Sequence, residues 1–177
     1  MSAAALLTLV ACSTRLDPTF EPAGTAGSGG ASECQELETA ESRYWICSAP
    51  LVSFEAARDD CRARGAELAS VESQPENDFL AAGTEGLSTH SNLWLGGSRD
   101  DQHVWTWPDG RVFWRGRADG SAPPEAYANW KAGEPNDAST VSTEPERCAV
   151  LTLFDTRWND RACSIGLSYF CELALTP

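Results

Sequence analysis

The cysteine content constrains the fold of this chain more than any other feature of its sequence. Seven cysteines occur in 177 residues, and none of their spacings is the short Cys-x-x-Cys of a zinc ribbon or a redox motif. In an exported protein, an even set of cysteines implies disulfides. The cysteines that follow the N-terminal segment form such a set, although spacing alone leaves their pairing open: Cys34, Cys47, Cys61, Cys148, Cys163 and Cys171.

The N-terminal segment indicates export. Residues 1–11 carry no charge and are mostly apolar, but they are too few to span a bilayer, so they are typical of a signal peptide. The run Leu9-Val10-Ala11-Cys12 resembles the lipobox of bacterial lipoproteins, in which cleavage precedes the cysteine and a lipid is attached to it. We therefore expect lipidation of Cys12, which would account for the odd cysteine. An ordinary signal peptide followed by a chance cysteine is the alternative.

A flexible tether is expected between this segment and a single folded domain. Residues 12–33 are rich in Gly, Ser, Thr, Ala and Pro, a composition typical of a linker. One domain is the default for the remaining length, and we expect it at residues 34–174. The expected location is the bacterial outer membrane or cell surface, with membrane attachment through the lipid on Cys12, and otherwise the protein is secreted.

Two helices are predicted from their capping residues. Ser53 is a candidate N-cap for a helix over Phe54–Arg64, and Gly65 stands just past its end. Residues 73–76 read Ser-Gln-Pro-Glu, which is a capping box with Pro in the first turn. This box predicts a second helix that runs through about Ala82.

Short apolar or aromatic runs are expected to form strands, and one long irregular segment interrupts them. Residues 115–147 are dominated by Gly, Pro, Asn, Asp, Ser and Thr. A loop this long inside a compact domain is usually functional or disordered, and here it carries acids and amides that favour function. The expected strands cover residues 44–47, 93–96, 104–107, 111–114, 149–154, a segment that begins at Trp158, and 168–173.

The charge of the chain argues against nucleic acid as a partner. Acidic residues outnumber basic ones by 26 to 13, which gives a formal net charge of −13. Such a field repels nucleic acid and suits the binding of cations, although it also serves simple solubility. We expect no nucleic-acid partner.

Acids and amides near the C-terminus supply a set of oxygen donors. The tripeptides are Glu-Pro-Asn at 134–136, Glu-Arg-Cys at 146–148 and Trp-Asn-Asp at 158–160, with no histidine close to them in the sequence. A hard cation prefers carboxylate and amide oxygens, so Ca²⁺ fits this set better than Zn²⁺ or copper. The candidate metal ligands are Glu134, Asn136, Glu146, Asn159 and Asp160.

The order of these motifs resembles the C-type lectin-like domain over residues 34–173. The matching segments are Tyr44-Trp45, the Ser53–Cys61 helix, Gly65–Ser70, the Glu76–Leu80 helix, Trp94–Gly97, Asn129-Trp130, Glu134–Asn136, Trp158–Asp160 and Tyr169–Glu172. The resemblance implies an α+β fold in which two helices flank small antiparallel sheets and a long loop binds the ligand. It also implies the disulfides Cys34–Cys47, Cys61–Cys171 and Cys148–Cys163.

The same resemblance implies a function for the oxygen donors. In sugar-binding members of the family, one Ca²⁺ is held at these positions, and the same side chains hydrogen-bond two vicinal sugar hydroxyls. All five positions are filled here: Glu134, Asn136, Glu146, Asn159 and Asp160. A cis Glu134–Pro135 bond is expected. Glu-Pro-Asn goes with mannose, N-acetylglucosamine and fucose rather than galactose, so Ca²⁺-dependent binding of glycans or glycoproteins is the expected function.

The site loop departs from the family pattern in its length. The step from Asn136 to Glu146 is long because residues 139–143 are added, so Glu144 competes with Glu146 as the expected ligand. Residues 115–126 also look like an insertion that could shape or obstruct the sugar surface.

A second calcium ion, which some members of the family bind, is not expected. Arg99 and Arg147 stand near positions where acids would be needed, although Asp100, Asp101 and Asp137 keep that site open.

Two other classes of function compete with carbohydrate binding. Domains of this fold also serve as protein-binding or adhesion modules through the same loop. An enzyme would need a carboxylate pair such as Glu134 and Glu146 to act as in glycoside hydrolysis, but both lie among amides in a loop. His90 and His103 lack a nucleophile partner, and no Gly-x-Ser-x-Gly or phosphate loop occurs. We therefore expect no catalysis.

Overall fold

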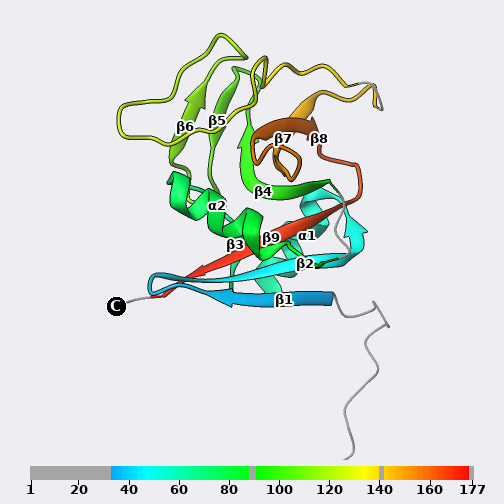
Figure 1. The fold of residues 1–177 in the computed structure, drawn as a ribbon. Helices are drawn as coiled ribbons and strands as arrows, with labels where there is room; N and C mark the ends of the chain where they lie inside the picture. The colour runs from blue at the N-terminus through cyan, green and yellow to red at the C-terminus, as the bar shows by residue number, and fades with distance from the viewer. Residues whose placement is uncertain (1–32, 88–90, 140–141, 176–177) are drawn as a thin grey trace, which may run out of the picture.

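The computed structural model describes residues 33–87, 91–139 and 142–175 (Figure 1). The expected signal peptide at 1–11, the expected lipidation site Cys12 and nearly all of the expected tether lie outside these residues. His90, which was weighed as a catalytic residue, lies outside them as well.

The described residues form two helices and nine strands. The helices are α1 (Phe54–Ala63) and α2 (Gln74–Gly83), and the strands are β1 (Glu33–Glu38), β2 (Ser42–Val52), β3 (Glu67–Leu68), β4 (Asn92–Arg99), β5 (Val104–Thr106), β6 (Val112–Arg115), β7 (Glu146–Thr152), β8 (Trp158–Ala162) and β9 (Leu167–Ala174). The predicted helices are confirmed, and each predicted strand overlaps an observed one. The short strand β3 and the largely polar strand β1 were not predicted.

Both helices begin where their serine caps predict. Ser53 Oγ accepts the N–H of Ala56 at 3.4 Å, and Ser73 Oγ accepts the N–H of Glu76 at 3.3 Å. The second cap differs from a standard capping box. The Glu76 carboxylate accepts the N–H of Glu72 at 2.8 Å, one residue before the expected donor.

The nine strands form one hydrogen-bonded network. Its main order is β1-β2-β9-β4-β5-β6, with β3 beside β9 and the β7–β8 hairpin beside β4. The expected small antiparallel sheets are present, but β4 and β9 run parallel and join them into one mixed sheet. Strand β9 connects the sheets because it pairs with β2 along one edge and with β4 along the other. The β7–β8 hairpin and the long loop lie at the end of the molecule away from β1 (Figure 1).

Three disulfides fix the strands and α1, and they are the three that the resemblance implied. Cys61 and Cys171 are separated by 110 residues, and their bond joins α1 to β9. In the chain-entropy view, a closed loop of this size stabilises the fold by about 4–5 kcal/mol. The other two disulfides are Cys34–Cys47, between β1 and β2, and Cys148–Cys163, between β7 and the segment after β8.

A cluster of buried aromatic rings lies beneath the long loop. The rings of Trp107 and Phe113 stack with centroids 4.1 Å apart. Trp130, the aromatic residue of the loop, packs edge-on against Trp105 at 4.7 Å and against Trp158 at 5.9 Å. Because such pairs are favourable beyond their buried area, the cluster anchors the loop to the sheet.

Candidate functional site

The long loop between β6 and β7 is attached to β8 around Trp130. The N–H of Lys131 donates to the carbonyl of Trp158 at 2.9 Å, and the N–H of Trp158 donates to the carbonyl of Asn129 at 2.8 Å. The side-chain amide of Asn129 also donates to the carbonyl of Thr156 at 2.9 Å. These bonds bring the residues that follow Lys131 alongside β8.

The Glu-Pro-Asn segment is fastened to an acid of β8. The Glu134–Pro135 peptide bond is cis, as expected, and Pro135 is buried. The backbone N–H groups of Asn136 and Asp137 donate to the two carboxylate oxygens of Asp160 at 3.1 and 2.8 Å. The structure therefore places the first and last predicted ligand segments in direct contact.

Glu146 is buried and Glu134 is half-buried, and both have buried oxygens that accept no hydrogen bond of good geometry. Glu146, the first residue of β7, is only 1% exposed, and no donor makes a well-formed hydrogen bond to either of its carboxylate oxygens. Oε2 of Glu134 is in the same state. A guanidinium nitrogen of Arg161 lies 3.6 Å from Glu146 Oε1, beyond hydrogen-bonding distance. Buried carboxylates without donors are costly, so the arrangement favours a bound cation.

The amide oxygens of the predicted set each accept one hydrogen bond and keep a second lone pair for a metal ion. Asn136 Oδ1 accepts the N–H of Ala138 at 2.7 Å, and Asn159 Oδ1 accepts the N–H of Asp160 at 2.8 Å. A carbonyl oxygen has two lone pairs, so each amide oxygen retains one for another contact.

Burial and mutual repulsion perturb the acids of the site. Burial, the neighbouring carboxylate of Asp160 and the charge of Glu146 together raise the pKa of Glu134 to about 7. Burial also raises the pKa of Glu146, with Asp160 as the next cause, while Arg161 and Ser139 act in the opposite direction. A divalent cation would relieve both the desolvation and the repulsion.

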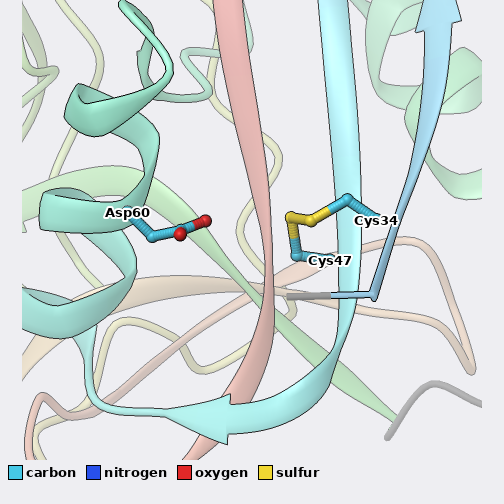
Figure 2. Close-up of side chains that lie close together, drawn as sticks. All are labelled: Cys34, Cys47 and Asp60. Carbon is cyan, nitrogen blue, oxygen red and sulfur yellow. A yellow bond between two sulfur atoms is a disulfide. The ribbon is translucent and has the colours of Figure 1, made fainter. Parts of the chain in front are cut away.

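The carboxylates of the candidate site lie near one another but do not form a compact cluster. Among residues 33–87, 91–139 and 142–175, the cluster of three His, Cys, Asp or Glu ligand atoms within 4.8 Å of one another is formed by Cys34, Cys47 and Asp60. Figure 2 shows Asp60 reaching toward the Cys34–Cys47 disulfide. A disulfide offers no thiolate to a metal, and Asp60 accepts the hydroxyl of Tyr169 at 2.6 Å. That cluster is therefore structural.

Arginines, which the predicted set did not include, connect the ligand segments. Arg99 Nη2 lies 2.8 Å from Asp137 Oδ2, and Arg99 Nε donates to the carbonyl of Glu146 at 3.0 Å. Oδ1 of Asp137 in turn accepts the N–H of Glu146 at 2.7 Å. Arg117, from the predicted insertion, donates to Asp137 at 3.2 Å and to the carbonyl of Asn136 at 3.3 Å. No local pattern in the sequence indicated these contacts.

Glu144 does not share the environment of the buried glutamates. Its side chain is exposed and accepts the hydroxyl of Ser164 at 2.6 Å. Glu146, by contrast, is buried beside Asp160. Burial therefore favours Glu146 over Glu144 as the ligand candidate.

The acids that kept a second calcium site open are engaged within the protein. Asp100 accepts two backbone N–H groups of its own turn at 2.9 Å. Asp101 pairs with Arg147 at 2.5 Å, and Asp137 pairs with Arg99. These contacts agree with the expectation of a single ion.

A groove of about 1260 Å³ lies elsewhere, between the start of α2, the start of β2 and the end of β9. Its lining includes Tyr44, Glu76 and Glu172 and none of the five predicted ligands. The candidate metal site and the groove are thus separate features.

Comparison with known proteins places the chain in a family. Residues 51–173 match the family described as the lectin C-type domain. The protein belongs to the C-type lectin domain family. Ladderlectin of Oncorhynchus mykiss is 38% identical over 117 residues, which cover 63% of this chain and 52% of that protein. The chain therefore spans about half the length of this relative.

Solved structures show the same fold. The carbohydrate-recognition domain of cow CD23, solved in the presence of a GlcNAc2Man3 oligosaccharide, superposes with a TM-score of 0.63 at 24% identity, covering 83% of this chain and 100% of that one. A calcium-independent type II antifreeze protein superposes with a TM-score of 0.59 at 22% identity, covering 82% and 98%. At these identities the likeness establishes the fold alone.

The family also bears on the class of function. C-type lectin domains are binding domains rather than enzymes, in agreement with the expectation of no catalysis. Three disulfides in one domain are typical of an extracellular protein. No helix in the described part of the chain is both long enough and apolar enough to cross a membrane.

Proposed function

We propose that the domain binds one Ca²⁺ at the junction of the long loop, β7 and β8. The observation that carries the proposal is the set of buried carboxylate oxygens on Glu146 and Glu134 that accept no hydrogen bond. Ca²⁺ takes about six to eight oxygen ligands, and carboxylates and amides are the kinds that it prefers. The residues that would hold it are Glu134, Asn136, Glu146, Asn159 and Asp160.

The proposed ligand of the loaded site is a sugar with two vicinal hydroxyls, of the mannose, N-acetylglucosamine or fucose type. Ca²⁺ would supply Lewis-acid coordination to the two hydroxyl oxygens. The side chains of Glu134 and Glu146 are acceptors for the hydroxyl protons, whereas the NH₂ groups of Asn136 and Asn159 are donors to the hydroxyl oxygens. The family and the Glu-Pro-Asn sequence support this choice.

Calorimetric titration tests both steps. We expect one Ca²⁺ per chain, and binding of methyl mannoside or N-acetylglucosamine that disappears in EDTA, with weaker binding of methyl galactoside. Glu146→Gln should abolish both steps, whereas Glu144→Gln, a matched change two residues away on an exposed side chain, should leave them intact. Sugar binding that ignores EDTA, or no Ca²⁺ binding at millimolar concentration, would refute the proposal.

A second candidate is a protein-binding module that needs no ion. The observation that favours it is that Asp160 and the Asn136 amide already hold the loop through backbone hydrogen bonds. Such a loop keeps its shape without a metal. A protein partner that binds equally well in EDTA, together with a blank glycan array, would favour this candidate.

We further propose that the domain is displayed on a bacterial surface through a lipid on Cys12. The lipobox-like run before Cys12 and the Gly- and Ser-rich residues that follow support this placement. The full chain expressed in a bacterium should enter the membrane fraction, and its N-terminal peptide should carry the mass of a lipid. The Cys12→Ser chain should lose both properties, and an unchanged membrane fraction would contradict the anchor.

A further inference from the structure

The candidate site is rich in positive side chains although the chain as a whole is strongly acidic. The whole sequence has 13 Lys and Arg residues against 26 Asp and Glu, for a formal net charge of −13. Arg99, Arg117 and Arg161 nevertheless all contact the predicted ligand segments. The site is thus closer to neutral than the whole chain, and this needs an explanation beyond Ca²⁺ binding, since positive groups oppose the entry of a cation.

The three arginines differ in their exposure to solvent. The Arg99 side chain is 3% exposed and ties Asp137 to the Glu146 backbone, so it is part of the framework. The Arg117 side chain is 50% exposed and that of Arg161 is 28% exposed. Only the last two are therefore able to reach a bound molecule.

The two exposed guanidinium groups approach the site from different elements. Arg161 lies on β8 and donates from Nη1 to the carbonyl of Asp160 at 3.2 Å. Arg117 comes from the segment after β6 and contacts the carbonyl of Asn136 and the carboxylate of Asp137. Each contact uses only part of the guanidinium group, which has five N–H donors. Unused donors therefore remain on both guanidinium groups next to the predicted ligand segments.

The charge balance of the site changes sign when an ion binds. Arg99 and Arg117 pair with Asp137, and Arg161 lies near Glu146 and the backbone of Asp160, while Glu134 and the Asp160 carboxylate are the other acids of the site. When all four acids are ionised, four negative charges against three positive ones leave a small negative excess that attracts a cation. A divalent cation turns this excess into a net positive charge, and a net positive site with free guanidinium donors attracts an anion.

We propose that the natural ligand of this site is an acidic sugar: a hexose whose vicinal hydroxyls meet the ion and whose carboxylate, sulfate or phosphate group meets Arg161 and Arg117. This inference rests on the proposed function and adds the class of glycan to it. Arginine suits the role because its planar fork of donors matches carboxylate, sulfate and phosphate oxygens in pairs.

Calorimetry on the Ca²⁺-loaded chain tests the proposal with matched sugars. Methyl mannoside is compared with methyl mannuronate, mannose 6-sulfate and mannose 6-phosphate, so that the arms distinguish the source of the negative charge. At least one acidic sugar should bind roughly tenfold more tightly than methyl mannoside, a factor equal to about 1.4 kcal/mol. The preference should shrink as salt is raised, because exposed charges are screened.

Variants assign the preference to the two arginines. At saturating Ca²⁺, Arg161→Gln and Arg117→Gln should each lower the ratio of the affinity for the acidic sugar to the affinity for methyl mannoside. Arg62→Gln is the matched control: it removes an exposed arginine that pairs with Glu67 and lines the separate groove. That control should keep the full preference.

The Ca²⁺ affinity measured without sugar distinguishes a direct role of Arg161 in sugar binding from a purely structural effect of its substitution. Arg161 lies near the carboxylate of Glu146, so Arg161→Gln should raise Ca²⁺ affinity in the absence of sugar while it lowers the preference for acidic sugars. Equal binding of neutral and acidic sugars, both lost in EDTA, would overturn this inference and leave the proposed function standing. No binding of any sugar would overturn both.

Discussion

Two acidic regions of this molecule look alike in the sequence and differ in how their oxygens are used. At the candidate site, Glu134 and Glu146 have buried oxygens that accept no hydrogen bond. In the groove beside α2, the carboxylates of Glu76 and Glu172 are also partly buried, but each of their oxygens accepts one. The donors are the hydroxyls of Tyr44 and Ser42 and the backbone N–H groups of Glu72 and Ser70.

The difference separates a structural acid from a candidate ligand. A buried carboxylate that accepts hydrogen bonds is stabilised by the protein itself, as Glu172 is. A buried carboxylate without donors is stable only if something else supplies positive charge, and no Lys or Arg nitrogen in the described residues comes within hydrogen-bonding distance of the Glu146 oxygens. The comparison therefore supports the proposed ion binding at one acidic region and a structural role for the acids of the other.

The largest effects are expected when one glutamate in each region is replaced by glutamine. Glu146→Gln should lower Ca²⁺ affinity by more than about 100-fold, because the amide lacks the charge that the ion needs. In EDTA the same change should leave the fold as stable or make it more stable, since it removes a buried charge that only the Arg161 guanidinium, at 3.6 Å, partly compensates. Glu172→Gln should do the reverse, destabilising the domain by about 1–3 kcal/mol while Ca²⁺ affinity stays the same.

Calorimetry for Ca²⁺ and urea unfolding in EDTA measure these two effects. The two glutamates lie on neighbouring parts of the same sheet network, so a general disturbance of the fold would affect both readouts. A Glu172→Gln chain that loses Ca²⁺ binding, or a Glu146→Gln chain that keeps it, would break the comparison.

The next largest effect is expected at Arg99. This buried guanidinium links Asp137 to the backbone of Glu146 and so orients two ligand segments without being a ligand itself. Groups that orient metal ligands typically change metal affinity by about 10–100-fold when removed. Arg99→Met should therefore weaken Ca²⁺ binding by that factor. A circular dichroism spectrum and three intact disulfides would show that the fold persists, and unchanged affinity would contradict the positioning role.

Removing one hydroxyl from the groove should have a smaller effect. Tyr44 donates to Glu76 Oε1 at 2.8 Å, and its hydroxyl is the donor that the structure gives to that oxygen. Tyr44→Phe keeps the ring, which packs against Phe79 at 5.8 Å, and should reduce the free energy of unfolding by about 1 kcal/mol. Ca²⁺ affinity should not change. Equal stability of the two chains would mean that water replaces the lost donor.

Much of the fold could be predicted from the sequence because its signals are local. Ser53 and Ser73 cap the helices that they predict, since a cap depends on residues within one turn. The parallel β4–β9 pair and the two-residue strand β3 could not be predicted in this way. Their pairing depends on which distant strand comes alongside, and β3 is too short to show any periodicity.

The same distinction between local signals and contacts of distant residues applies to the candidate site. Its five predicted ligands lie in three short motifs, and a family resemblance connects such motifs. None of the arginines was a predicted ligand, although Arg161 directly follows the Trp-Asn-Asp motif. Arg99 and Arg117 reach the site through the fold, so contacts such as Arg117 with Asp137, twenty residues away, became evident only in three dimensions.

The smallest expected effect is the pH dependence that Glu172 adds in the groove, separate from the dependence that the raised pKa values of Glu134 and Glu146 add at the metal site. Burial raises the pKa of Glu172 above the ordinary value of 4.5, so the native state holds its proton more tightly than the unfolded chain. The stability that this proton contributes is complete below pH 4.5 and is lost as the pH rises through the native pKa.

Glu172→Gln should therefore destabilise the domain more at pH 4 than at pH 7. Urea unfolding of both chains at each pH, in EDTA and in Ca²⁺, measures this difference. Because Glu172 is satisfied by the protein's own donors, Ca²⁺ should not change it. A difference that vanishes when Ca²⁺ is added would mean that the two acidic regions are coupled, and the division between structural acid and ligand would then fail.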